Sequence, residues 1–267
     1  MRVITANVNG IRATARRGGL TWLAAQRADV ITLQEVRASD AQLRATLEAG
    51  GFGAWHVAHA PSSLAGRAGV AVLSRVEPVG VRMGVGGEEF AEAGRWVETD
   101  VPAEDGRVVT VASVYVHTGE AGTPRQGEKQ RFLEAAGERL AGWAGAGRYA
   151  VLTGDLNVAH RDEDLKNWRG NRGRAGVLPE ERACLDRWVG EIGIVDVHRR
   201  LAGPGPGPYT WWTWRGQAFD NDAGWRIDYQ LATADLAATA VRAEVGRAAA
   251  YAERWSDHAP VTVDYAL

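Results

Sequence analysis

The sequence predicts an α/β fold in which two β-sheets pack face to face with helices on the outside. Short apolar runs typical of strands outnumber the segments with helical periodicity. The helical segments lie between the strands along the chain and are not gathered at one end. Two packed sheets with helices outside would bury the apolar faces of both kinds of element. The order of the strands within each sheet does not follow from these patterns.

The predicted elements follow one another along the whole chain. Strand-like runs lie at residues 2–8, 29–34, 69–74, 95–101, 107–116, 149–154, 226–232 and 259–265. Helical patterns lie near residues 19–27, 39–49, 127–142 and 179–190. An apolar stripe at near-helical spacing indicates that the third helix packs on the core, and it consists of Phe132, Leu133, Ala136, Leu140 and Trp143. Pro and Gly at 203–208 predict a surface loop.

The composition is typical of a globular protein. Hydrophobic residues make up 45% of the 267 residues and charged residues 24%. The chain has no apolar run of the roughly 18 residues that predict a membrane span, and its start lacks the pattern of a signal peptide. The single cysteine, Cys184, excludes an internal disulfide and a cysteine-rich zinc site. Because no linker or repeat is visible, we expect one domain, residues 1–267. The missing signal-peptide pattern and the single cysteine favour the cytoplasm.

An acid and an amide close the apolar run at 149–154. Asp155 and Asn157 are two residues apart, so in an extended chain their side chains point the same way. Gly154 allows a close backbone approach or a sharp bend just before them. The pair could open an ordinary turn, because Asp and Asn often do so after strands. The alternative is that both side chains face one site.

Other strand-like runs carry similar polar residues at or near their ends. These residues are Asn7, Asn9, Glu35, Asp228, Asp257 and His258. Each one alone could be a turn former or a paired core residue. Together, oxygen-bearing side chains without a cysteine favour a hard divalent cation such as Mg²⁺ or Mn²⁺. A carboxylate next to a histidine suits proton handling, since the carboxylate can orient the imidazole and raise its basicity.

These segments resemble, in the same order, the exodeoxyribonuclease III family of abasic-site endonucleases. This family is part of the endonuclease/exonuclease/phosphatase superfamily, to which DNase I also belongs. The matching stretches cover nearly the whole chain: NVNGIRA, LQEV, GVAVLSR, SVYV, GDLNVAH, GWRIDY and SDHAPV. GDLN and SDH mark the superfamily, whereas NGIRA and WRIDY narrow it to the exonuclease III branch. The resemblance implies a four-layer α/β sandwich whose two sheets are mainly antiparallel or mixed.

The resemblance also implies an activity. Such enzymes use Mg²⁺, with Mn²⁺ as a substitute, to hydrolyse the DNA phosphodiester 5′ to an abasic site. Further activities of the family are 3′→5′ exonuclease and 3′-phosphatase or 3′-phosphodiesterase. The implied partner is double-stranded DNA with abasic sites or blocked 3′ ends, and we expect a monomer without a membrane partner.

The family pattern assigns roles to residues of this chain. Glu35 resembles the principal metal ligand, and the other residues at or beside the metal are Asn7, Asn9 and Asp257. Asp155 resembles the residue that activates the attacking water, and Asn157 would hold that water or a phosphate oxygen. His258, supported by Asp228, would contact the scissile phosphate, and Tyr115 would donate a hydrogen bond to a phosphate oxygen or the leaving group.

Two further groups of residues would bind the DNA. Phosphate contacts are expected from Arg12, Lys166, Arg169, Asn171, Arg172 and Arg174. An apolar pocket for the abasic sugar is expected from Trp211, Trp225 and Ile227. The chain departs from some relatives at two of these positions, because Arg174 replaces an asparagine and Trp211 replaces a phenylalanine.

Two other functions remain compatible with the motifs. The first is another phosphohydrolase of the superfamily, acting on a phospholipid, an inositol phosphate or a nucleotide. The second is a DNA-binding relative without catalysis, which would be expected to lack a metal or water-activating residue, and the chain lacks none of them. The formal net charge of −2 argues against a general basic nucleic-acid binder, although it permits a local positive surface.

Overall fold

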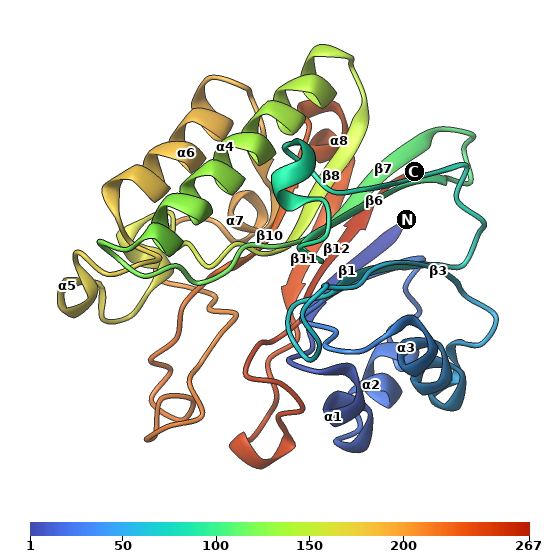
Figure 1. Ribbon diagram of the computed structural model, residues 1–267, viewed down its shortest axis with the longest axis horizontal. Helices are drawn as coiled ribbons and strands as arrows, with labels where there is room; N and C mark the ends of the chain where they lie inside the picture. Colours follow the sequence, from blue (N-terminus) through green and yellow to red (C-terminus); the bar gives the residue numbers. More distant parts are fainter.

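A computed structural model describes residues 1–267 and shows two mixed six-stranded sheets packed together between layers of helices (Figure 1). The first sheet contains β1 (Arg2–Asn7), β2 (Val30–Gln34), β3 (His56–Ala60), β4 (Val70–Ser74), β11 (Ala240–Val245) and β12 (Val261–Tyr265). The second sheet contains β5 (Gly80–Met83), β6 (Trp96–Pro102), β7 (Val108–Tyr115), β8 (Tyr149–Asp155), β9 (Val195–Asp196) and β10 (Asp228–Ala232). This arrangement confirms the predicted α/β sandwich.

The helices lie mainly on the outer faces of the two sheets (Figure 1). They are α1 (Ile11–Arg16), α2 (Gly19–Ala25), α3 (Asp40–Leu47), α4 (Pro124–Gly145), α5 (Trp168–Asn171), α6 (Pro179–Gly190), α7 (Val197–Ala202) and α8 (Ala234–Ala238). Short helical turns are η1 (Glu48–Phe52), η2 (Gly87–Phe90), η3 (Asp162–Asp164) and η4 (Tyr251–Glu253). None of the helices combines the length and the apolarity that crossing a bilayer requires.

Three apolar clusters separate the layers. Valines such as Val3, Val111 and Val263 fill the space between the sheets. A second cluster joins α1, α2 and α3 to the outer face of the first sheet. A third joins α4 and α6 to the second sheet, and the predicted stripe of α4, from Phe132 to Trp143, is buried in it. Each apolar face that the sequence pattern predicts is therefore covered by another layer.

The strand order brings four strand ends to one edge of the sandwich. The first sheet has the order β11-β12-β1-β2-β4-β3, and the second has the order β5-β6-β7-β8-β10-β9. In each sheet only the central pair is parallel, β1 with β2 and β7 with β8. Parallel neighbours end at the same edge of a sheet. Across the two sheets, the Nδ2 atom of Asn7 at the end of β1 lies 2.9 Å from the Oδ2 atom of Asp155 at the end of β8, so these edges coincide.

Candidate active site

The strand registers place polar side chains side by side at this edge. Asn7 at the end of β1 pairs with Gln34 of β2, directly before Glu35. Tyr115 at the end of β7 pairs with Asp155 of β8. Asp228, the first residue of the antiparallel strand β10, also pairs with Asp155. Neighbouring strands therefore position these side chains, and the sandwich brings both sets together.

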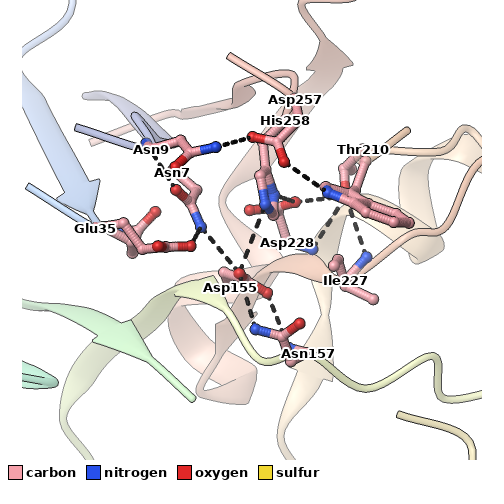
Figure 2. Close-up of polar contacts among 12 residues, drawn as sticks. Asn7, Asn9, Glu35, Asp155, Asn157, Thr210, Ile227, Asp228, Asp257 and His258 are labelled. Atoms are coloured by element: carbon pink, nitrogen blue, oxygen red, sulfur yellow. Dashed lines mark hydrogen bonds and ion pairs between the residues drawn. The ribbon is translucent and has the colours of Figure 1, made fainter. Parts of the chain in front are cut away.

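The buried amide of Asn7 joins two of the acidic side chains (Figure 2). Its Nδ2 atom donates hydrogen bonds to Glu35 Oε1 and to Asp155 Oδ2, both at 2.9 Å. The other oxygen of Glu35 accepts a hydrogen bond from Arg37. Glu35 and Asn157 both have left-handed backbones, with φ of 50° and 49°. Such conformations are unfavourable for residues with a side chain and tend to concentrate at functional sites.

Gly154 lets the end of β8 approach its neighbour closely. Its φ is 130°, and a Cβ atom at this position would lie 2.0 Å from the carbonyl oxygen of Val114 in β7. A real Cβ atom would overlap that oxygen. The expected close backbone approach is therefore confirmed, and it fixes the direction in which Asp155 leaves the strand.

His258 lies between two buried carboxyl groups (Figure 2). Its Nδ1 atom is 2.9 Å from Asp228 Oδ2, and its Nε2 atom is 3.7 Å from Asp155 Oδ2. Burial lowers the pKa of His258, but Asp228 and Asp155 outweigh that effect and raise the pKa to about 10. Burial also raises the pKa of Asp155, to about 8, against the opposing charge of His258. The imidazole is therefore cationic at neutral pH.

Thr210 fixes Asp228 from the other side. Its Oγ1 atom donates a hydrogen bond of 2.6 Å to Asp228 Oδ2 and accepts hydrogen bonds from the backbone N–H groups of Ile227 and Asp228, both at 3.1 Å. Thr210 is completely buried, so this geometry is rigidly held. Thr210 is not recognisable as a site residue from the sequence, because a threonine before an aromatic run carries no signal of its own.

Tyr115 lies on the wall of the same site. Burial and the negative charges of Glu35 and Asp155 raise the pKa of its hydroxyl above the ordinary value of a tyrosine. The phenol therefore keeps its proton at neutral pH and acts as a hydrogen-bond donor. Asn157 is held close by, since its backbone N–H donates to Asp155 Oδ1 at 2.9 Å and its Nδ2 atom donates to the Val116 carbonyl at 2.8 Å.

The acidic group fits a divalent cation. Glu35, Asp155 and His258 each place one potential ligand atom within 4.8 Å of the others. Because the imidazole is cationic at neutral pH, the two carboxylates would hold the ion, and His258 lies beside it. Carboxylate oxygens are the preferred ligands of Mg²⁺ and Mn²⁺. Burial, and to a smaller extent the charges of Asp228 and Glu35, raise the pKa of Asp155, and a bound cation would favour its carboxylate form. Asp257 is not a member of this group, and its two oxygens accept hydrogen bonds from Asn9 Nδ2 at 2.7 Å and Trp211 Nε1 at 3.1 Å.

A cleft of about 660 Å³ opens over these residues. The predicted site residues that line it are Asn9, Glu35, Tyr115, Asp155, Asn157, Asn171, Arg174, Trp211, Trp225, Ile227, Asp257 and His258. Asn7 and Asp228 are buried beneath the cleft and contact its walls through hydrogen bonds. The cleft also contains residues that the sequence analysis did not assign to it, notably Arg37, Asn167 and Thr213.

One wall of the cleft is apolar. The rings of Trp211 and Trp225 meet edge to face with centroids 6.3 Å apart, and Ile227 lines the same space. The Trp211 ring is also 6.5 Å from the imidazole of His258. The apolar wall therefore lies directly beside the cationic imidazole of His258.

The predicted DNA-contacting residues divide into two groups. Asn171 and Arg174 line the cleft. Arg12, Lys166, Arg169 and Arg172 are exposed and do not line it. Arg169 and Arg172 each stack on Trp168, with guanidinium carbons 4.4 Å from the ring centroid. This stacking places both guanidinium groups next to α5, the short helix that contains the cleft residue Asn171.

The fold and the cleft define a class of protein, the metal-assisted phosphohydrolases built on a two-sheet α/β sandwich. The model of the endonuclease/exonuclease/phosphatase family matches residues 4–258. The chain belongs to this family and, within it, to the exodeoxyribonuclease III branch that the sequence motifs predict.

Relatives of known name agree with this assignment. An exodeoxyribonuclease of Bacillus subtilis is 34% identical over 98% of this chain and 98% of its own length. An AP endonuclease from Archaeoglobus fulgidus superposes with a TM-score of 0.86 at 26% identity, with full coverage of both chains. The 3′-phosphatase NExo from Neisseria, solved with a product DNA hairpin, superposes with a TM-score of 0.85 at 28% identity, again over 100% of both chains.

Proposed function

We propose that the protein is a DNA repair nuclease that uses Mg²⁺, or Mn²⁺ as a substitute, to hydrolyse the phosphodiester 5′ to an abasic site. We include 3′→5′ exonuclease and 3′-phosphatase or 3′-phosphodiesterase activity in the proposal. The observation that carries it is one cleft in which the carboxyl groups of Glu35 and Asp155, a cationic histidine and a tryptophan wall meet. The names of the relatives, an exodeoxyribonuclease, an AP endonuclease and a 3′-phosphatase, support the same substrate class.

The side chains have complementary roles in the proposed hydrolysis. Asp155 orients the attacking water and, in its carboxylate form, accepts its proton, while Asn157 holds the water or a phosphate oxygen. Because burial raises the pKa of Asp155, the carboxylate form depends on the nearby positive charges of His258 and of the bound cation. The new bond joins the water oxygen to phosphorus, and the bond to the 3′ oxygen breaks. His258 and Tyr115 donate hydrogen bonds where negative charge develops on the phosphate and the leaving oxygen. The products are a 3′-hydroxyl and a 5′-phosphate.

Glu35 is the proposed principal ligand of the cation, with the Asp155 carboxylate within reach. When bound, the cation supplies Lewis-acid stabilisation of the phosphate charge. Asn7 orients Glu35 and Asp155 through its two hydrogen bonds. Asn9 and Asp257 hold each other next to this group and complete the proposed metal environment.

The apolar wall accounts for the choice of an abasic sugar. In this proposal a sugar without a base enters the space lined by Trp211, Trp225 and Ile227, whereas an intact nucleotide would have to bring its base into the same space. Extruding a nucleotide also requires least energy where pairing and stacking are already lost. Asn171 and Arg174 in the cleft, with the exposed Arg12, Lys166, Arg169 and Arg172, are the proposed phosphate contacts.

The remaining parts of the proposal concern the chain as a whole. We propose that residues 1–267 act as one domain, since the core between the sheets joins Val3, Val111 and Val263 from distant parts of the chain. A monomer in the cytoplasm is the proposed state, in keeping with a single cysteine that is buried.

A nicking assay tests the function. Duplex DNA with one abasic site is incubated with the protein in Mg²⁺ and in EDTA, beside the same duplex intact, a duplex with a 3′-phosphate, an inositol phosphate and a nucleotide. We expect cleavage at the abasic site in the presence of Mg²⁺ and no cleavage in EDTA. Asp155→Ala and His258→Ala should each reduce turnover by about 10²–10³-fold while staying folded. Hydrolysis of only the inositol phosphate or the nucleotide would support the alternative phosphohydrolase, and binding without cleavage would support the non-catalytic alternative.

A further inference from the structure

A buried ion pair lies beneath the loops of the cleft. Lys129 of α4 and Glu181 of α6 are both fully buried, and Nζ of the lysine is 2.6 Å from Oε1 of the glutamate. α4 and α6 lie side by side outside the second sheet (Figure 1), and neither residue lines the cleft. Apolar residues in place of a buried ion pair often give equal or greater stability. Stability alone therefore does not account for this pair.

Lys129 holds two backbone segments that line the cleft. Besides the carboxylate, its Nζ atom donates hydrogen bonds to the carbonyl oxygens of Asn157, at 2.8 Å, and Thr118, at 3.1 Å. Thr118 and Asn157 both line the cleft, one after β7 and the other after β8. All three donors of the ammonium group are thus used, and none is directed at the substrate space.

Glu181 holds the end of the loop at residues 161–176, which carries the proposed phosphate contacts from Lys166 to Arg174 and is called the DNA-facing loop. Its Oε2 atom accepts hydrogen bonds from the backbone N–H groups of Gly176, at 2.6 Å, and Leu178, at 3.0 Å. Its Oε1 atom accepts from Gln126 Nε2 at 2.8 Å as well as from Lys129. Because this segment directly follows Arg174, the carboxylate fixes the position at which the loop leaves the cleft.

The two anchored segments also touch each other directly. The N–H group of Ala159 donates to the Gly176 carbonyl at 2.8 Å. A Cβ atom at Gly176 would lie 3.0 Å from the carbonyl oxygen of Asn157 and 3.0 Å from the ring of Trp225. The carbonyl that Lys129 holds is therefore packed against the loop that Glu181 holds.

We propose that Lys129 and Glu181 are positioning residues that tie the end of β8 to the DNA-facing loop. The pair keeps Asn157, which contacts the reacting phosphate or water, at a fixed distance from Arg174, which contacts the DNA backbone. It transfers no proton and touches no substrate. The effect of the pair on catalysis rests on the proposed nuclease function, whereas the link between the two segments can be tested without that function.

The test compares two variants. The double variant Lys129→Met with Glu181→Gln removes both charges at similar volume, so no unpaired charge is left buried. The matched control is Glu98→Gln on β6, because Glu98 is also buried, pairs with Arg82 and Arg139, and lies outside the cleft. The measurements are kcat and KM on abasic duplex DNA, corrected for the folded fraction, and amide hydrogen exchange of segments 116–120, 155–160 and 171–178.

We expect the double variant to lose about 10–100-fold in kcat, the loss that a displacement of about 1 Å in a site can cause. We also expect faster exchange in all three segments together, whereas the control keeps the wild-type kcat and exchange there. Wild-type kcat and exchange in the double variant would overturn the proposal, as would equal losses in the control. If the double variant does not fold, Glu181→Gln alone is measured, and unchanged exchange at 171–178 overturns the proposal.

The exchange measurement separates this inference from the function. A wild-type protein that leaves abasic DNA intact refutes the proposed nuclease, and the exchange of the three segments still decides whether the ion pair joins them.

Discussion

Replacing Asp228 by asparagine tests the charge on His258. Asp228 Oδ2 is 2.9 Å from His258 Nδ1, and both side chains are buried. Burial lowers the pKa of His258, and the carboxylates of Asp228 and Asp155 raise it to about 10. Asparagine keeps the volume of the side chain but removes the nearer of these charges. We therefore expect the pKa of His258 to fall in the variant.

A neutral imidazole no longer stabilises the phosphate charge as a cation. Removing one such donor costs about 10²–10³ in rate, or roughly 2.7–4 kcal/mol, and we expect kcat on abasic DNA at pH 8 to fall by that factor. In the wild type, His258 stays protonated until the pH approaches 10, so the positive charge is present throughout the neutral range. The variant should recover part of its activity as the pH is lowered and lose more as the pH rises.

Two measurements check this prediction. An NMR titration of the imidazole in EDTA follows the protonation of His258 directly, and kcat is measured against pH in Mg²⁺. Asp264→Asn is the control, since Asp264 pairs with Arg2 at the surface and lies outside the cleft. The reasoning is refuted if Asp228→Asn retains the wild-type kcat, or if its His258 is still protonated at pH 8 as in the wild type.

Three further predictions concern stability and specificity. Asp164 is buried against Arg226 and Arg199. Burial alone would raise the pKa of the Asp164 carboxyl group, but the neighbouring arginines, chiefly Arg226, outweigh burial and lower this pKa to about 2. Asp164→Asn should lower the free energy of unfolding by about 3–5 kcal/mol at pH 7 in a denaturant melt, and an unchanged value contradicts the prediction. Because the folded pKa is lowered, the wild-type carboxylate stabilises the fold above roughly pH 4 and this contribution is lost as the pH falls toward 2. Gly154→Ala should cost at least about 2 kcal/mol by thermal melting, since its Cβ overlaps the Val114 carbonyl, and a wild-type melting temperature would show that β8 can shift. Trp225→Ala should raise KM for abasic DNA or reduce the preference for abasic over intact DNA while kcat stays closer to that of the wild type, and an unchanged preference would remove Trp225 from the pocket.

The sequence predicts the buried part of the fold well, for a physical reason. The strands nearest the site are buried on both faces, because each is covered by the other sheet and by helices, and the apolar residues that predominate in most of them make these runs easy to find. Polar residues at the ends of these runs, such as Asn7 and Asp155, stand out against the apolar background. The resemblance to the family assigns chemical roles to these polar residues.

The edges of the sheets were not predicted, because their sequences are ambiguous. β3, β5, β9 and β11 are edge strands, and β5 alternates between partly buried and exposed residues over only four positions. The strand expected at 226–232 begins only at Asp228, and the N–H groups of the two residues before it bond outside the sheet, that of Arg226 to the Asp164 carbonyl and that of Ile227 to Thr210. These features depend on contacts with residues far away in the chain.

Parts of the site were also outside the reach of sequence patterns. Thr210 supports Asp228 from a distance of 18 residues, and Lys129 reaches Asn157 from 28 residues away. The stacking of Arg169 and Arg172 on Trp168 is decided by the conformation of a short helix, α5, that no periodicity predicts. Such contacts follow from the closed sandwich and not from local spacing.

The most direct test of the account is the chemistry of the cut itself. A duplex labelled at its 5′ end and carrying one abasic site is treated with the wild type and with Asp155→Asn in Mg²⁺, and the product ends are resolved on a sequencing gel. We predict a single cut 5′ to the abasic sugar that leaves an extendable 3′-hydroxyl, with almost no product from the variant. Cleavage on the 3′ side of the abasic sugar, or equal product from Asp155→Asn, would contradict the central claim that water attacks the 5′ phosphodiester in the cleft lined by Glu35, Asp155 and His258.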